Sequence, residues 1–154
     1  MLKQGDRAPS FDLPTADMDM LDLASFNGKK NVLLYFYPKD DTPGCIIEAV
    51  EFTDLLEDFA TAETVVLGVS KDTCISHGAF RDKHGLVVQL LADVEGTASV
   101  AYGVWQERDK NGVKRMALLR STFIIDKQGI IQYALYDVRP KGHAADMLEL
   151  VQGL

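Results

Sequence analysis

The chain has 154 residues, 47% of them hydrophobic, and carries 16 Lys and Arg against 23 Asp and Glu, for a formal net charge of −7 at pH 7. This length favours one domain spanning residues 1–154, and the hydrophobic content is enough for a packed core and too high for a disordered chain. The acidic balance argues against a nucleic-acid partner and against an anionic membrane surface, because both are bound through an excess of Lys and Arg.

The N-terminal stretch MLKQGDRAPSFDLP places charges and prolines where a signal peptide needs an unbroken apolar segment. No apolar run of the chain approaches the ~18 residues of a membrane span. We therefore expect a cytoplasmic protein. Its two cysteines, Cys45 and Cys74, do not predict a structural disulfide framework, since reduced thiols are usual in that compartment.

The predicted elements alternate along the chain after a first segment, residues 1–30, that carries only short strand-like pieces. The run NVLLYFY at 31–37 is apolar throughout, which predicts a buried strand. Over residues 43 to about 62, apolar residues recur at helical spacing, which predicts a helix. Farther along, the pattern predicts strands over 64–70 and 86–93, helices over 73–85 and 95–103, two strands over 113–126 and 130–138 joined by the turn DKQG, and a closing helix over 142–152.

This order of elements predicts the fold class. Alternating strands and helices give a parallel core through right-handed crossovers, and the late pair of strands adds antiparallel neighbours. We expect an α/β three-layer sandwich with a mixed central β-sheet flanked by helices. The order is compatible with a thioredoxin-like fold, although periodicity alone does not separate that fold from a flavodoxin-like one.

The stretch DTPGC, residues 41–45, predicts a helix start with a cysteine inside it. Thr42 is a good N-cap residue and Pro43 is favoured at the first helical position, so Cys45 is expected to be the third helical residue. There, unpaired backbone N–H groups and the positive end of the helix dipole favour the thiolate. Gly44 would let another group approach the sulfur closely.

Two interpretations of Cys45 compete. A lone cysteine is most often a small buried apolar residue. The junction between a buried strand and a helix is, however, where α/β folds place their sites, which favours a reactive thiol. Because position 42 is Thr, exchange within a C-x-x-C motif is excluded, and a single-thiol reaction remains. The hydroxyl of Thr42 is then placed to hydrogen-bond a second atom bound at the sulfur.

The stretch YPKDDTPGC fits the Pro-x-x-x-Thr-x-x-Cys signature of the peroxiredoxins, as Pro38, Thr42 and Cys45. With GDRAPSFDLP, SHGAFRDKHGL, YGVWQE and RSTFIID, the chain closely resembles the peroxiredoxin Q (bacterioferritin comigratory protein) subfamily nearly from end to end. The resemblance implies a thioredoxin-like fold and a thiol-dependent peroxidase, an antioxidant oxidoreductase. It implies no bound cofactor, because sulfur performs the redox chemistry.

The same resemblance implies roles for five residues. Cys45 is the peroxidatic cysteine, which attacks hydrogen peroxide or an alkyl hydroperoxide and becomes a sulfenic acid. Thr42 hydrogen-bonds the peroxide, Pro38 shields the sulfur, and Arg120 stabilises the thiolate and the developing charge. Without the family, Arg120 would be interpreted as an outward-pointing residue of a half-buried strand. Glu48 matches a frequent family position, and its alternative role is a favourable charge near the helix N-terminus.

The chain departs from the family at the resolving cysteine, the residue that forms a disulfide with the sulfenic acid. Many members carry it five positions after the peroxidatic one, where this chain has Val50. Cys74 is either a displaced resolving cysteine or an idle thiol. In the second case an external thiol is needed, and the resemblance implies thioredoxin. We expect a monomer or a homodimer.

Three rival interpretations remain. A metal site of Cys74, His77 and His84 lacks a fourth ligand and a recognisable spacing, so we expect no metal, with His77 on the surface and His143 on the surface or at a helix start. A peroxide-sensing redox-regulatory module would use the same first step at Cys45. A non-catalytic thioredoxin-like domain is disfavoured by the joint presence of Pro38, Thr42, Cys45 and Arg120.

Overall fold

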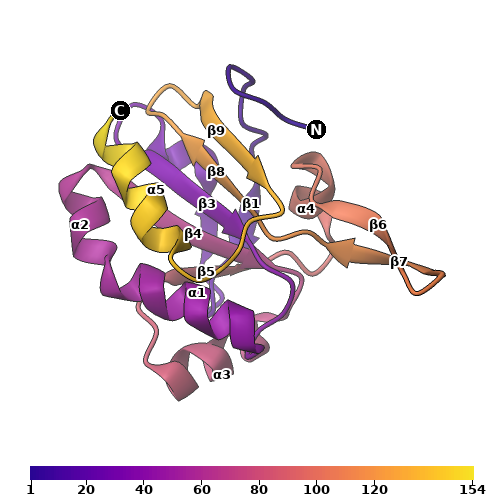
Figure 1. The fold of residues 1–154 in the computed structure, drawn as a ribbon. Helices are drawn as coiled ribbons and strands as arrows, with labels where there is room; N and C mark the ends of the chain where they lie inside the picture. Colours follow the sequence, from indigo (N-terminus) through magenta and orange to yellow (C-terminus); the bar gives the residue numbers. More distant parts are fainter.

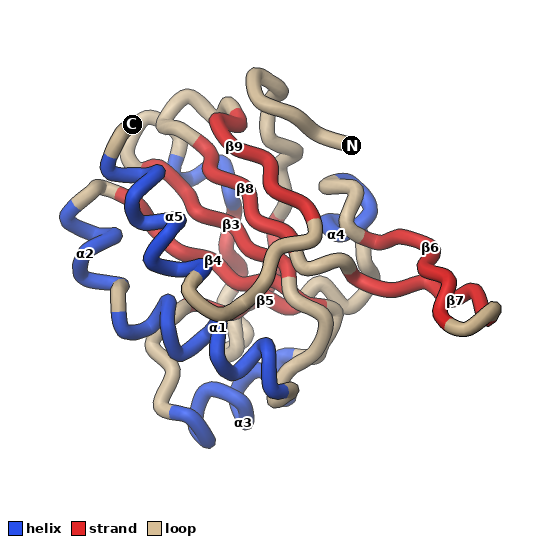
Figure 2. Tube along the Cα trace, viewed as in Figure 1, coloured by secondary structure: helices blue, strands red, loops and turns tan.

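The computed structural model describes residues 1–154 and is built around a five-stranded mixed sheet (Figures 1 and 2). The strand order across this sheet is β5-β4-β3-β8-β9. Three neighbouring strands are parallel: β3 (Asn31–Phe36), β4 (Thr64–Ser70) and β5 (Gln89–Ala92). On the other side of β3, β8 (Ser121–Ile125) runs antiparallel to both of its neighbours, β3 and β9 (Ile131–Tyr136). The predicted mixed α/β sheet is therefore confirmed.

Helices flank this sheet, and α1, α2 and α5 lie together on the face turned toward the viewer in Figure 1. The helices are α1 (Pro43–Asp54), α2 (Leu56–Thr61), α3 (Cys74–His84), α4 (Thr97–Ala101) and α5 (His143–Gln152), with a 3₁₀ helix η1 at Leu23–Phe26. Two small two-stranded sheets complete the fold: β1 (Asp12–Pro14) with β2 (Met20–Asp22), and β6 (Trp105–Lys110) with β7 (Val113–Leu118).

The sheet separates two hydrophobic cores, and the alternation of side chains along β3 shows how. Leu33 and Tyr35 point into a core shared with α1, α2, α3 and α5. Val32, Leu34 and Phe36 point to the opposite core, which is shared with η1 and α4. Burial on both faces explains why the sequence of β3 is apolar at nearly every position. It also fixes the end of β3 firmly, which is the point from which α1 starts.

Several predicted boundaries are corrected by the structure. The helix predicted over 43–62 is two helices, because the chain leaves helical geometry at Leu55, whose N–H is shared between the carbonyls of Phe52 and Thr53. The strand predicted over 113–126 is also wrong: it divides into β7 and β8, which belong to different sheets. The strands 64–70 and 130–138, the helix ending at Gly85 and the closing helix are confirmed within one to two residues at most ends.

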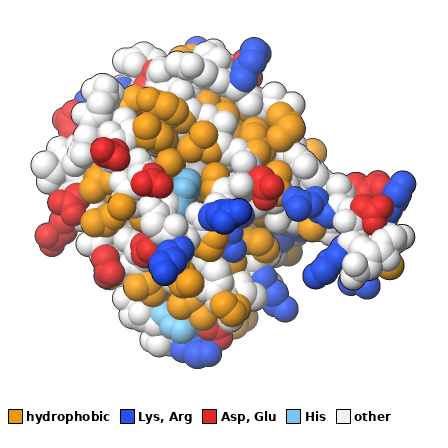
Figure 3. Space-filling model, viewed as in Figure 1, with side chains coloured by type: hydrophobic (Ala, Val, Ile, Leu, Met, Phe, Trp, Pro, Cys, Tyr) orange, Lys and Arg blue, Asp and Glu red, His pale blue; other side chains and the backbone are white.

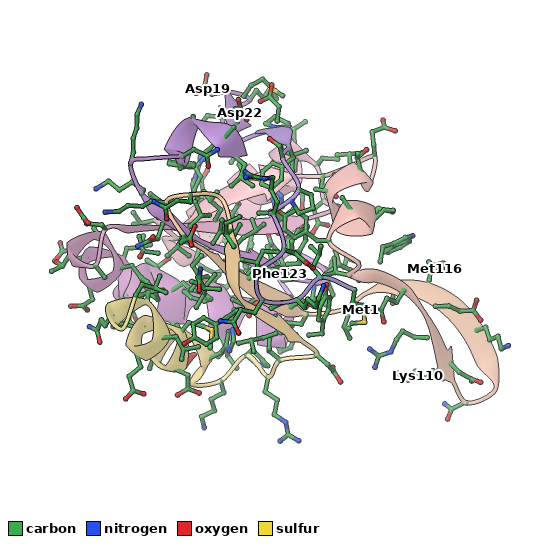
Figure 4. All side chains as sticks on the ribbon, turned by 90° about the horizontal axis from the view of Figure 1, so that it is seen from above. Met1, Asp19, Asp22, Lys110, Met116 and Phe123 are labelled. Atoms are coloured by element: carbon green, nitrogen blue, oxygen red, sulfur yellow. The ribbon has the colours of Figure 1, made fainter.

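The hairpin of β6 and β7 was missed in the sequence. Its turn is the dipeptide Asn111-Gly112, with both residues at positive φ, which matches the twist of a two-residue hairpin. Figure 4 shows Lys110 and Met116 on this hairpin, extending away from the body, whereas Phe123 lies inside it. Only its base packs on a core, through Trp105 and Leu118, whereas residues 107–116 are exposed and largely charged, so they show no apolar alternation.

The surface is unevenly charged. On the face shown in Figure 3, acidic side chains gather along the left side, where α2 carries Glu57 and Asp58, and basic side chains lie toward the centre and along the hairpin on the right. None of the helices combines the length and the hydrophobicity that crossing a bilayer requires.

Candidate functional site

Cys45 is the third residue of α1, as predicted from DTPGC, and the residue is only 1% exposed. Thr42 occupies the N-cap position, but its side chain makes no capping hydrogen bond. Its hydroxyl donates instead to the carbonyl oxygen of Lys39, at 2.9 Å. The N–H groups of Gly44 and Cys45 therefore donate no hydrogen bond within the chain. The start of α1 keeps unused donors beside the sulfur, where a substrate oxygen can accept from them.

Arg120 meets this cysteine from a part of the chain 75 residues away. Its Nη2 donates to Cys45 Sγ at 3.3 Å, and its Nη1 donates to Glu48 Oε1 at 2.6 Å. Burial alone would lower the pKa of the guanidinium, but Glu48 and Cys45 outweigh burial and raise it, so Arg120 stays charged. The prediction that Arg120 lies inside a strand is wrong, because it occupies the short link between β7 and β8.

Glu48 is fully buried one turn further along α1. Burial raises the pKa of Glu48 to about 7, and the contact with Arg120 opposes that rise without cancelling it. Only one carboxylate oxygen has a partner, since Oε2 is buried without a hydrogen bond. A charged arginine thus joins the sulfur and the carboxylate, and Glu48 fixes the direction in which the guanidinium points.

Gly44 is required for this contact. A Cβ at this position would lie 3.0 Å from Arg120 Nη2 and 3.3 Å from Pro140 Cγ. Both distances are tighter than ordinary van der Waals contacts, so a side chain would push the guanidinium away from the sulfur. The expectation that Gly44 allows a close approach to Cys45 is confirmed, and the approaching group is Arg120.

Tyr35 of β3 packs against the side of α1 that faces the sheet. Its ring stacks on Phe52 of α1 with the ring centroids 4.7 Å apart. A Cβ on Gly68, the β4 neighbour of Tyr35, would lie 2.6 Å from the Cζ of that ring, so the glycine makes room for it. Burial raises the pKa of Tyr35 well above its usual value, and the nearby Glu48 raises it further. The phenol therefore stays protonated and serves packing rather than proton transfer.

His143 was expected at the surface or at a helix start. It is the first residue of α5 but is buried, with Nε2 2.7 Å from the hydroxyl of Thr122 and its ring edge-on to Phe52. Burial lowers the pKa of His143 to about 4, so the ring is neutral at pH 7. The surface expectation failed because the histidine packs against two elements, β8 and α1, that are distant in the sequence.

His77 was also expected at the surface, and the structure corrects this. It is completely buried, with Nδ1 2.7 Å from Asp40 Oδ2, whereas His84 pairs with Asp41 near the other end of α3. Cys74, His77 and His84 therefore form no common site. The one group with the ligand types and spacing for a metal is Asp40, Asp72 and His77, and each of these side chains already makes hydrogen bonds within the protein.

The remaining candidates, Pro38 and Cys74, make no hydrogen bond to the sulfur. Pro38 is exposed in the loop after β3. Cys74 is the first residue of α3, and its side chain is partly exposed. Both cysteines are free thiols.

Comparisons with known proteins agree with this geometry. Residues 4–134 match the AhpC/TSA family. Peroxiredoxin Bcp of Bacillus subtilis is 39% identical over 150 residues, which cover 97% of this chain and 95% of the relative. A structure of Xanthomonas campestris bacterioferritin comigratory protein, described for its alkyl peroxide reduction activity, has a TM-score of 0.89 and 31% identity over 93% of this chain and 90% of that one. A PrxQ variant of Xylella fastidiosa has a TM-score of 0.93 and 31% identity over 99% and 97% of the two chains.

These matches extend over nearly the whole chain and include solved structures of the same fold. The chain thus belongs to the AhpC/TSA family and has the thioredoxin-like fold of its thiol peroxidases. Within that family it is a peroxiredoxin of the peroxiredoxin Q type, the group that includes the proteins named Bcp. Peroxiredoxins reduce peroxides at the expense of thiol reductants.

Proposed function

We propose that this peroxiredoxin reduces hydrogen peroxide and alkyl hydroperoxides at Cys45, as an antioxidant enzyme. The observation that carries the proposal is the hydrogen bond from Arg120 Nη2 to Cys45 Sγ at 3.3 Å. A positive charge fixed beside a buried sulfur favours the thiolate, which is the form that attacks peroxides. No other cysteine of the chain has such a partner, because Cys74 accepts no hydrogen bond from an arginine or lysine.

The proposed reaction is a displacement at oxygen. The Cys45 thiolate attacks the terminal oxygen of the hydroperoxide, a sulfur–oxygen bond forms, and the oxygen–oxygen bond breaks. Sulfur is oxidised to a sulfenic acid, and the leaving oxygen takes up a proton and departs as water or an alcohol. Negative charge spreads from sulfur to both oxygens on the way, so Arg120 stabilises the transition state more than the free thiolate.

Thr42 is proposed to hold the peroxide in line. Its hydroxyl proton is already donated to Lys39, so the oxygen keeps lone pairs that accept a hydrogen bond from the O–H of the substrate. The unused N–H groups of Gly44 and Cys45 are the complementary donors for the charge that develops on oxygen. We further propose that Pro38, exposed at the loop before them, shields the sulfur from bulk water.

Glu48 is proposed to act through Arg120. Its Oε1 accepts from the Nη1 nitrogen of the guanidinium, which leaves Nη2 directed at the sulfur. Removing this acceptor would free the guanidinium to turn away.

A thiol is proposed to complete the cycle by reducing the Cys45 sulfenic acid, either Cys74 through a disulfide or a thioredoxin-type protein directly. Cys74 is partly exposed and Cys45 is buried, so a direct bond between them requires local movement of the chain. We also propose that residues 1–154 act as one domain, in a reducing compartment such as the cytosol, because both thiols are free and turnover must return Cys45 to its reduced form.

Turnover tests this proposal. Purified protein with a thioredoxin system should consume hydrogen peroxide and cumene hydroperoxide, and Cys45→Ser should abolish the consumption of both. In a single-turnover measurement Cys74→Ser is the matched control, since it keeps the Cys45 oxidation step whichever thiol resolves the sulfenic acid. A wild-type protein that oxidises once and does not turn over with any thiol would favour the peroxide-sensing module instead.

A further inference from the structure

A second buried polar cluster lies beside the site, where the loop of residues 38–42 meets the first turn of α3. Tyr37 ends the apolar run of β3, Asp40 lies in the loop, and Ser76 and His77 belong to α3. Asp40 is the hub of the cluster: its Oδ1 accepts from the Tyr37 hydroxyl at 2.6 Å, and its Oδ2 accepts from the Ser76 hydroxyl at 2.7 Å. The same Oδ2 lies 2.7 Å from His77 Nδ1.

The partners of His77 hold both of its ring nitrogens. Its Nε2 lies 2.9 Å from the carbonyl oxygen of Leu91, and a carbonyl oxygen only accepts, so Nε2 donates this hydrogen bond. Its Nδ1 lies 2.7 Å from Asp40 Oδ2, and one proton joins the two atoms in a hydrogen bond. The side chains of His77 and Asp40 are 0% and 5% exposed, so water does not replace this bond. Such a buried pair holds only while its geometry is kept, because separation leaves buried polar atoms without partners.

The backbone of the loop is tied to the same place. The N–H of Asp40 donates to Asp72 Oδ2 at 2.8 Å, and that oxygen also accepts from the Ser70 hydroxyl at 2.6 Å. Ser70 ends β4, and Asp72 precedes Thr73, the N-cap residue of α3. Asp40 thus ties the loop to the end of β4 and to the start of α3, through both its side chain and its main-chain N–H.

This anchor lies directly next to the reacting groups. Lys39, whose carbonyl accepts from Thr42, is adjacent to Asp40 in the chain, and α1 begins at Pro43. Moving the loop would break several buried hydrogen bonds together, and no other position offers these partners. The loop position therefore sets where Thr42 and the first turn of α1 lie relative to Arg120.

Resting on the proposed function, we propose that Asp40, with Tyr37, Ser76 and His77, is the positioning element of the reactive loop and holds Cys45 in the place where it meets Arg120. None of these four residues touches the substrate. They act on the reaction by fixing the loop against α3, and Asp40 is the positioning residue on which the others converge.

Asp40→Asn and Ser76→Ala test this inference. Asp40→Asn keeps the shape of the side chain and removes its charge, and Ser76→Ala removes one hydrogen bond from a partly exposed position and should fold in any case. Asp41→Asn is the matched control. Asp41 is the adjacent residue and also contacts α3, but its ion pairs with Lys83 and His84 are exposed, and Asn tolerates its positive φ of 59°.

Two rate constants of Cys45 are measured on each folded variant, with peroxide and with iodoacetamide. We expect Asp40→Asn to slow the reaction with peroxide by about tenfold or more, because misplaced donors lose their effect on the transition state. The same variant should speed alkylation by iodoacetamide, because the buried sulfur becomes accessible. Ser76→Ala should change both rates in the same directions by smaller factors, and Asp41→Asn should match the wild type.

Opposite changes in the two rates distinguish positioning from a general loss of stability, which alters neither rate in the folded protein. If the folded variants match Asp41→Asn in both rates, the inference is wrong; should Asp40→Asn not fold, Ser76→Ala alone decides. A wild-type protein that does not react with peroxide at all would sink the proposed function, while the alkylation rates would still report on the loop.

Discussion

The starts of α1 and α3 resemble each other in sequence and in the fold, yet only one of them is built as a reactive site. Each helix follows a strand of the parallel part of the sheet, each has a threonine at its N-cap, and each carries a cysteine in its first turn. Thr73 caps α3 by accepting from the N–H of Ser76 at 3.1 Å. Thr42 turns its hydroxyl to Lys39 and leaves α1 uncapped.

The difference shows what a helix start needs in order to do chemistry. A capped first turn has its donors satisfied and is stable, whereas an uncapped one keeps donors for a ligand at a cost in stability. At α1 the cost is offset by packing of Phe52 and by the Arg120 contact. At α3 the cysteine is at the first helical position, partly exposed and without a cationic partner, so a thiol at a helix start is not sufficient.

The largest expected effect separates the two cysteines. Cys45→Ser should reduce peroxide consumption to the uncatalysed background, because no other thiol of the chain is activated by an arginine. Cys74→Ser should leave the second-order rate constant of Cys45 oxidation unchanged. Stopped-flow tryptophan fluorescence or competition with a second peroxidase measures both. Equal losses of this oxidation rate constant in the two variants would remove the distinction between the two helix starts.

The next effect concerns the cation. Arg120→Lys keeps the charge but cannot donate to Cys45 and Glu48 at once with two parallel donors. We expect the rate constant with peroxide to fall by roughly 10²–10³-fold, as when one donor to a developing anion is removed. Circular dichroism would show that the fold is retained. A rate within twofold or so of the wild type would show that Arg120 is only a structural contact.

A paired substitution of the two threonines sharpens the comparison further. Thr73→Ala should lower the free energy of unfolding by ~1 kcal/mol, the usual cost of an N-cap, and leave the peroxide rate unchanged. Thr42→Ala should do the reverse: it loses no capping hydrogen bond, but it loses the group that holds the substrate. Urea unfolding and stopped-flow kinetics on both variants check this. The account fails here if both threonines affect the same quantity.

The smallest effect is a pH dependence of stability that comes from two buried groups packed near α1. Burial raises the pKa of Glu48 from 4.5 to about 7, so the folded state keeps a proton that the unfolded state loses, and stability falls as pH rises through this window. Burial lowers the pKa of His143 from 6.5 to about 4, so the unfolded state binds a proton first, and stability is lost as pH falls from 6.5 to 4.

These two slopes have opposite signs over overlapping pH ranges, so they partly cancel in the wild type. Glu48→Gln should remove the first slope and leave a protein that loses stability toward acid more steeply. His143→Asn should remove the second and leave one that loses stability as pH rises toward 7. Urea unfolding across this range measures both. Parallel curves for the three proteins would show that neither group titrates on unfolding.

Much of the fold and of the reactive helix start could be predicted from local sequence. The apolar run of β3, the Thr-Pro-Gly start of α1 and the glycine at the end of α3 each act within a few residues. The turn DKQG between β8 and β9 is local in the same way. Where a few neighbouring residues decide the conformation, the sequence pattern was sufficient to predict it.

What failed depended on contacts between distant segments. The burial of His77 and His143 follows from packing against a loop, a strand and another helix, which spacing does not reveal. Arg120 was found through its family resemblance and was misplaced within a strand, because its contact with Cys45 spans 75 residues. The role of Asp40 was not visible in the local sequence, since its partners Ser76 and His77 lie 36 and 37 residues away in α3.

The most direct test of the central claim, that Cys45 beside Arg120 is the thiol that peroxide oxidises, is mass spectrometry of the reduced protein after one equivalent of hydrogen peroxide. We expect the modified peptide to contain Cys45, either with one added oxygen atom or joined to Cys74 with the loss of two hydrogen atoms. The first product would mark an external thiol as the resolving group, and the second would mark Cys74. An unmodified Cys45, or an oxygen atom carried by Cys74 alone, would contradict the account.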